Sequence, residues 1–180
     1  MRVLLHACCA PCTIKFAEAL RAERIKPDMF WYNPNIHPYT EYKNRKESLG
    51  RFAKESNLRL IEEDFYGLRE FIGKTASAGS RCKTCYSMRL DETAKHAARN
   101  GYDAFATTLL ISPHQKHDAL IYLGEKAAAA NKVKFLYRDY RDKFYEGQKQ
   151  AREAGYYMQK YCGCIFSEEE RYLGLEKPTD

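Results

Sequence analysis

The sequence has no long hydrophobic run, no internal repeat and no low-complexity tract. No apolar stretch approaches the roughly 18 residues that a membrane-spanning helix needs, so we expect no membrane association. The apolar N-terminal stretch is too short for an export signal, and we therefore expect a cytoplasmic protein. Nothing marks a domain boundary within the 180 residues, a length typical of one domain. With 44% hydrophobic and 30% charged residues, the composition is globular and excludes a disordered chain.

Cysteine, by contrast, is abundant and clustered. The seven cysteines form three groups, which we call the N-terminal thiols (Cys8, Cys9 and Cys12), the helix thiols (Cys82 and Cys85) and the C-terminal thiols (Cys162 and Cys164). Isolated cysteines are often small buried hydrophobes, but that explanation is weak for three groups in one chain. Because disulfides are rare in the cytoplasm, grouped cysteines there indicate metal binding or redox chemistry.

Segments with strand and helix periodicity alternate along the chain. Strands are predicted at 2–7, 29–32, 57–65, 102–112 and 133–139. Helices are predicted at 11–24, 40–56, 81–101, 114–131 and 142–160, with a short helix after 66 that dissolves into a flexible loop. This alternation predicts an α/β fold, a parallel sheet flanked by helices with right-handed crossovers. We expect a single α/β domain over residues 1–180, with a C-terminal helix and a Cys-Gly-Cys tail.

Two motifs follow predicted strands at the edge where such sheets bind ligands. CCAPC comes directly after the first strand, and TTLLISPHQ ends the fourth. Ligands of open parallel sheets bind at the carboxyl ends of the strands, near the point where the strand order reverses. We therefore expect the two motifs to face each other across that point.

The spacing within each cysteine group favours convergence on one site. Cys82 and Cys85 are three residues apart on one helix face, at a helix start, where the dipole favours thiolates. Gly163 lets the C-terminal thiols approach each other. Four thiolates would suit zinc, and Cys9-Ala-Pro-Cys12 has the form of a thiol–disulfide couple. An iron–sulfur cluster, which gathers about four thiolates from distant segments, is favoured, and the other two uses remain alternatives.

Four motifs together resemble one known family over essentially the whole chain. They are LLHACCAPC, RCKTCYSMRLDETA, FATTLLISPHQ and YCGCIFS. They resemble, in the same order, the epoxyqueuosine reductase family of the QueH type. The YRQ triplet that usually precedes YCGC in this family is Tyr157-Met158-Gln159 here.

The resemblance implies a reaction, a cofactor and partners. The family reduces the epoxide of epoxyqueuosine, at the wobble position of tRNA with a GUN anticodon, to the alkene of queuosine. It implies a 4Fe–4S cluster without cobalamin, an external electron donor and a Rossmann-like fold similar to the adenine-nucleotide α-hydrolases (HUP-like). Because seven thiols exceed the four of one cluster, an additional iron ion is a further expectation. A zinc-structured tRNA-binding protein without catalysis is the alternative function, and a metal-free thiol oxidoreductase is a third.

Candidate site residues follow from the motifs. For the cluster and any second metal we expect Cys8, Cys9, Cys82, Cys85, Cys162 and Cys164 as ligands. As catalytic residues we expect Cys9, Cys12, Arg89 and His114, with Arg89 on the helical face of Cys85. For contacts to the nucleoside we expect Asn33, Thr107, Thr108, Ser112 and Gln115 at the ends of the second and fourth strands.

The charge balance is compatible with an RNA partner. The formal net charge is +6, and a basic excess suits phosphate binding. One run interleaves cations with aromatic residues that could stack on unpaired bases: Lys132, Lys134, Phe135, Tyr137, Arg138, Tyr140, Arg141 and Lys143. This run is the RNA surface that the sequence suggests, with a solvated helix face as the alternative.

Overall fold

The computed structural model describes residues 1–175 and has a five-stranded parallel sheet at its centre. The strands are β1 (Val3–His6), β2 (Asp28–Trp31), β3 (Leu60–Glu62), β4 (Ala104–Thr107) and β5 (Lys134–Phe135). Their order is β3-β2-β1-β4-β5, with every pairing parallel. The predicted α/β fold is confirmed. The order is that of a doubly wound sheet, and it reverses between β1 and β4.

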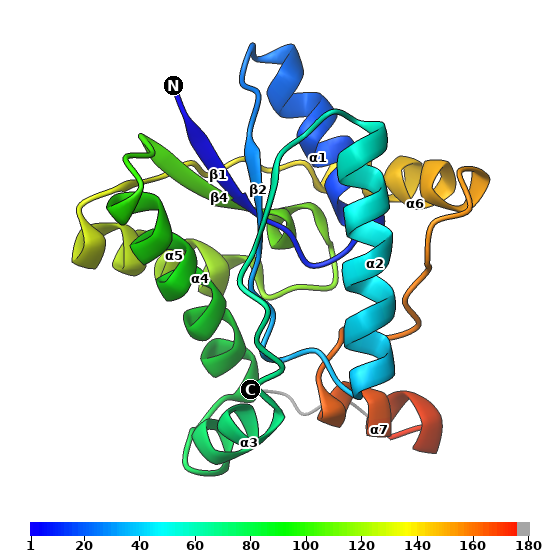
Figure 1. Cartoon of the computed structure of the whole chain (residues 1–180). Helices are drawn as coiled ribbons and strands as arrows, with labels where there is room; N and C mark the ends of the chain where they lie inside the picture. The colour runs from blue at the N-terminus through cyan, green and yellow to red at the C-terminus, as the bar shows by residue number, and fades with distance from the viewer. Residues whose placement is uncertain (176–180) are drawn as a thin grey trace.

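Helices cover both faces of the sheet. They are α1 (Ala10–Ala22), α2 (Tyr39–Glu55), α3 (Leu68–Ala76), α4 (Arg81–Arg99), α5 (His117–Asn131), α6 (Phe144–Glu153) and α7 (Ile165–Leu173), with short 3-10 helices η1 (Thr108–Ile111) and η2 (Arg141–Lys143). Figure 1 shows α4 and α5 on one face and α1, α2 and α6 on the other. The helices α3 and α7 lie beyond the edge toward which β1 runs.

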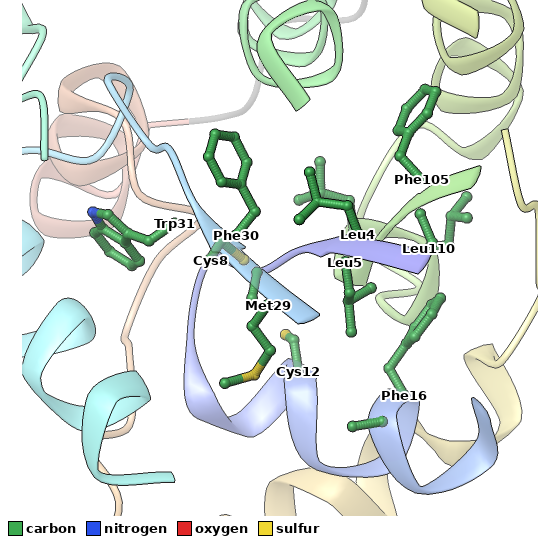
Figure 2. Packing of buried hydrophobic residues seen from close by; sticks show 14 of the residues in the cluster. Leu4, Leu5, Cys8, Cys12, Phe16, Met29, Phe30, Trp31, Phe105 and Leu110 are labelled. Carbon is green, nitrogen blue, oxygen red and sulfur yellow. The ribbon is translucent and has the colours of Figure 1, made fainter. Parts of the chain in front are cut away.

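The central strand β1 is buried on both faces. Leu4 and Leu5 are fully buried and point to opposite sides of the sheet, as Figure 2 shows. Leu4 lies on the side of Phe30, and Leu5 lies on the side of Met29. A strand buried on both faces reads as a continuous apolar run rather than an alternating one, which is why VLLH was recognisable in the sequence.

The second half of the chain differs from the sequence prediction in several places. The strand predicted at 102–112 contains only Ala104–Thr107, and Thr108–Ile111 form the 3-10 helix η1. The strand predicted at 133–139 contains only Lys134–Phe135, and the helix predicted from 114 begins at His117. The helix predicted to reach 160 ends at Glu153, because Gly155 adopts a left-handed φ of 67° that stops it. The tail contains a helix, Ile165–Leu173, which the sequence analysis did not predict.

Candidate functional site

The N-terminal thiols lie in the loop between β1 and α1. Cys9 is the N-cap residue of α1, with extended backbone, and Cys12 lies in the first turn behind Pro11. All three thiols are buried, and the Sγ atoms of Cys8 and Cys9 are 3.9 Å apart. Cys8 Sγ also lies 3.9 Å from Thr108 Oγ1 in η1. The loops that follow β1 and β4 therefore meet where the strand order reverses, as predicted.

The helix thiols and the C-terminal thiols form a second concentration of sulfur. Cys85 and Cys164 are both buried in one small apolar cluster with Phe71, and Cys162 is exposed. Burial raises the pKa of the Cys85 thiol, and the charges of Cys162 and Cys164 raise it further, while Arg89 opposes them. Segments about 80 residues apart in the sequence thus bring their sulfur atoms into electrostatic contact.

Arg89 connects the two concentrations of sulfur. Its side chain is 2% exposed, its Nη2 lies 3.0 Å from Cys85 Sγ, and its Nε donates to the Cys85 carbonyl oxygen. Burial alone would lower the pKa of this guanidinium, but the thiolates of Cys85, Cys8 and Cys162 outweigh it and raise the pKa. Among residues 1–175 no carboxylate forms an ion pair with Arg89. One buried cation therefore contacts Cys85 and interacts electrostatically with thiols of the other two groups.

Arg45, in α2, forms hydrogen bonds to the backbone around the C-terminal thiols. This fully buried guanidinium donates from Nε to Glu41 Oε1 at 2.6 Å. Its Nη1 and Nη2 donate to the carbonyl oxygens of Cys162 and Tyr161 at 3.0 and 2.9 Å. Gly163 has a φ of 140°, and a Cβ there would lie 3.2 Å from Arg45 Nη1, so only glycine fits the turn beneath the arginine.

Two glutamine amides donate hydrogen bonds to sulfur. Gln159 Nε2 lies 3.0 Å from Cys9 Sγ and 3.9 Å from Cys12 Sγ. Gln115 Nε2 lies 3.5 Å from Cys162 Sγ, and its Oε1 accepts from the Tyr86 hydroxyl. Each concentration of sulfur therefore has a neutral N–H donor directed at one of its sulfur atoms.

His6 connects the ends of three strands next to the thiols. Its Nδ1 lies 3.0 Å from Thr107 Oγ1, and its Nε2 faces the Tyr32 carbonyl oxygen and Asn33 Oδ1, each at 3.2 Å. Burial, with a smaller contribution from Arg89, lowers the pKa of His6 to about 4. The imidazole is therefore neutral near pH 7 and serves as a structural bridge between β1, β2 and β4.

Comparison with known proteins gives one consistent result. The family model described as "Epoxyqueuosine reductase QueH" matches residues 3–170. A protein of that name from Dehalococcoides mccartyi is 37% identical over 99% of this chain and 98% of its own length. The chain belongs to the QueH family.

The predicted family membership is thereby confirmed by a second relative as well. A "QueH" protein from Thermotoga maritima is 33% identical over 94% of this chain and 91% of its own length. A solved structure, a predicted subunit of a tRNA methyltransferase from Methanocaldococcus jannaschii, covers 87% of this chain and 89% of its own, with a TM-score of 0.48 and 13% identity.

In this QueH chain the predicted catalytic residues Cys9, Cys12 and Arg89 each lie beside a sulfur atom or a donor to sulfur. Cys9 and Cys12 lie within reach of one glutamine amide, and Arg89 lies against Cys85. His114 is placed differently. It is exposed, and its ring packs edge-on against Phe144 at 5.5 Å, so no contact joins it to a thiol. Its catalytic role stays a prediction.

The residues predicted to contact the nucleoside divide into two kinds. Thr107 and Asn33 are fully buried and hydrogen bond within the protein, Thr107 to His6 and Asn33 to His6 and the Ala7 carbonyl. Their side chains therefore hold the strand ends next to the thiols in place. Thr108 is also fully buried and lies 3.9 Å from Cys8 Sγ, whereas Gln115 is half-buried and contacts the exposed Cys162. Ser112, which is buried, accepts from the His114 backbone amide, in agreement with a turn-forming role.

The sequence analysis missed three contributors to this QueH site, Glu41, Arg45 and Gln159. Glu41 and Arg45 have i,i+4 spacing in a helix that is otherwise highly charged, and this spacing was the available signal. Gln159 lies in a stretch that was predicted to be helical and is not, so its contact with Cys9 could not be anticipated.

Among residues 1–175, no three histidine, cysteine, aspartate or glutamate side chains stand at the mutual spacing of a bound metal ion. No helix in this part of the chain is long and apolar enough to cross a membrane. The cytoplasmic location stays a prediction.

Proposed function

We propose that this protein reduces the epoxide of epoxyqueuosine in tRNA to the alkene of queuosine. Membership of the QueH family supports the reaction. The observation that carries it to this site is the buried guanidinium of Arg89, which contacts Cys85 Sγ, interacts electrostatically with Cys8 and Cys162, and has no ion-paired carboxylate among residues 1–175. The reaction takes up two electrons and two protons, breaks both epoxide C–O bonds and releases the oxygen as water.

The residues fit an iron–sulfur cofactor. None of the seven cysteines forms a disulfide, and burial and mutual repulsion make it costly for several to be thiolates together. Iron would offset that repulsion, since thiolates are the usual ligands of iron–sulfur clusters. A cluster with four thiolates is itself anionic, and Arg89 is a buried cation that otherwise lacks a carboxylate partner. Iron would therefore offset the repulsion between the thiolates, and the anionic cluster would offset the charge of Arg89.

We also propose a partition of the thiols between the cluster and a second metal. The helix thiols, with one or two of Cys8, Cys9 and Cys12, would hold a 4Fe–4S cluster. The C-terminal thiols, with a remaining N-terminal thiol, would complete it or hold an additional iron ion. Such a centre supplies single electrons and a Lewis acid for the epoxide oxygen.

The other site residues would prepare the chemistry rather than perform it. Arg89 holds positive charge beside the thiolates, where added electrons increase the negative charge. Gln115 and Gln159 donate N–H groups to sulfur, and such bonds orient ligands and tune their reactivity. Arg45 holds the Cys-Gly-Cys turn in place. An external electron donor must supply the two electrons in single steps.

The experiment is an anaerobic purification followed by visible absorption before and after dithionite, with iron and sulfide assayed on the same sample. A brown protein that bleaches on reduction, and that converts epoxyqueuosine-tRNA to queuosine-tRNA with dithionite as reductant, is the expected result. A colourless protein that carries zinc after failed anaerobic reconstitution would overturn the proposal and favour the zinc-structured tRNA-binding protein. Four irons per chain and no more would remove the additional iron ion.

A matched pair of variants tests the ligand assignment. Cys85→Ser should lose the visible absorption, because its sulfur is buried beside Arg89. Ser87→Ala, two residues further along α4, removes a hydroxyl that bonds only to Asp91 and should leave iron and sulfide unchanged. Equal loss in both variants would indicate a folding defect, and the far-ultraviolet circular dichroism of each protein distinguishes that case.

A further inference from the structure

Three lysines directly follow residues of the site in the sequence: Lys83 follows Cys82, Lys116 follows Gln115, and Lys160 follows Gln159. Lys83 and Lys116 line one hollow. Gln115 contacts Cys162, two residues after Lys160, so the segments that carry Lys116 and Lys160 lie side by side. Lys83 and Lys160 are exposed, and neither forms an ion pair with a carboxylate in the part of the chain that the structure describes.

A shallow hollow of about 420 Å³ lies between the first turns of α4 and α5. It is lined by Lys83, Lys116, His117, Asp118, Ala119 and Tyr122. The Tyr122 ring is 66% exposed. His117 Nε2 is hydrogen bonded to the Tyr137 hydroxyl at 3.0 Å, which fixes the imidazole at the rim. Exposed aromatic faces beside lysines are the chemistry that binds unstacked bases and phosphates of single-stranded RNA.

The basic run suggested by the sequence, 132–143, is less suitable. Arg138 is engaged by Glu23 through three hydrogen bonds, and Arg141 is engaged by Asp139. Phe135 packs against Phe105 in the interior, with ring centroids 5.2 Å apart. These charges are already balanced, and this aromatic ring is not free to stack on a base.

We infer that the anticodon loop of the RNA substrate docks on Lys83, Lys116 and Lys160, with an unpaired base in the hollow beside Tyr122. This inference rests on the proposed function, since a modified wobble base that reaches the thiols would bring its loop to the segments of Cys82, Gln115 and Gln159, which the three lysines directly follow. Phosphates on either side of that base meet Lys83 and Lys160. An acidic protein would also meet the lysines, but it would make no use of the exposed tyrosine and imidazole. Asp118 is the carboxylate in the lining, and it opposes RNA binding.

The test is binding of a labelled anticodon stem-loop RNA with guanosine at the wobble position. Fluorescence anisotropy of the anaerobically purified protein is followed from about 50 to about 200 mM salt. K83A/K160A should raise the Kd about tenfold or more and reduce the salt slope by about 1.4, from about 0.7 for each lost phosphate contact. The control K26A/K54A removes the same charge from exposed lysines at the amino edge of the sheet and should change the Kd less than about twofold. D118N should lower the Kd.

Any other result would contradict either the docking surface or the proposed reaction, and the results differ for the two. If K83A/K160A binds the RNA as the wild type does, or if K26A/K54A loses as much affinity, the docking surface is wrong. The same holds if the wild type binds no RNA at the lowest salt. If epoxyqueuosine-tRNA is still reduced in such a case, the proposed reaction stands without this surface, which is then left for an acidic protein. If RNA binding depends on these lysines and the loaded wild type reduces no epoxide, the surface stands and the proposed reaction fails.

Discussion

Arg89 Nη2 lies 3.0 Å from Cys85 Sγ in the interior of the protein, and among residues 1–175 the guanidinium has no ion pair with a carboxylate. Burying a charge costs desolvation free energy. In the metal-free protein thiols rather than a carboxylate offset that cost for Arg89, and the anionic cluster that we propose would offset it further.

Arg89→Met should have opposite effects on the two forms of the protein. The metal-free variant should unfold at higher urea concentration, with a free energy of unfolding about 1 kcal/mol or more above that of the wild type. Its iron affinity should fall about 10- to 100-fold, as for other residues that support metal ligands. Arg89→Lys keeps the charge and should retain more iron. A variant that is both less stable without metal and normal in iron content would contradict this account.

Glu41→Gln should destabilise the fold strongly, because it leaves the buried Arg45 without its carboxylate. Breaking a buried ion pair from one side costs about 3 to 5 kcal/mol. Urea unfolding measures the loss. Glu47→Gln is the matched control on the same helix. Its partner Lys43 is 3.8 Å away and both side chains are exposed, so the free energy of unfolding should change by less than about 1 kcal/mol. Similar losses in both would refute the special role of Arg45.

Gly124→Ala should lower thermal stability even though alanine favours a helix. A Cβ at Gly124 would overlap the Phe135 ring, which cannot retreat because it packs on Phe105. We expect a net loss of about 1 to 2 kcal/mol from overpacking. Gly50→Ala, in the middle of α2 with nothing within 4 Å of the added Cβ, should instead gain about 0.5 to 1 kcal/mol. Calorimetry of the two variants should give shifts of opposite sign.

The ion pair between Glu23 and Arg138 predicts a dependence of stability on pH. Arg138, followed by Tyr140, lowers the pKa of the Glu23 carboxyl below its ordinary value of 4.5. A depressed pKa contributes stability above pH 4.5 that is lost as the pH falls through the folded-state pKa. Both side chains are about a third exposed, so the contribution is below about 1 kcal/mol. The stability difference between the wild type and Glu23→Gln should be present at pH 7 and shrink below pH 4.5. A difference that grows in acid would contradict the assignment.

The sequence carried the central features of the fold because they depend on local patterns. The buried run of β1 and the helix spacing of Cys82, Cys85 and Arg89 could be recognised within a few residues. The meeting of CCAPC with Thr108 followed from a rule about parallel sheets rather than from any residue pair. These elements were predicted correctly.

Other parts of the site depend on contacts between distant segments. Arg45 binds carbonyl oxygens at 161 and 162, more than a hundred positions away, and no periodicity in α2 reveals them. The i,i+4 spacing of Glu41 and Arg45 would suit an ion pair on the protein surface equally well. The helix α6 ends because Gly155 adopts a left-handed backbone conformation. The residues around Gly155 favour a helix, so the sequence pattern did not indicate this end.

The bond between Gln159 and Cys9 spans 150 positions of sequence, and this span orders events during synthesis. A ribosome makes the thiols at 8–12 and 82–85 long before the segment at 157–164. A nascent chain therefore presents five thiols without the turn that Arg45 later holds. Contacts of such long range form late in folding, so the site closes only after nearly the whole chain has emerged. Iron delivered earlier would meet an open, half-built set of ligands, and loading after translation is the order that this topology favours.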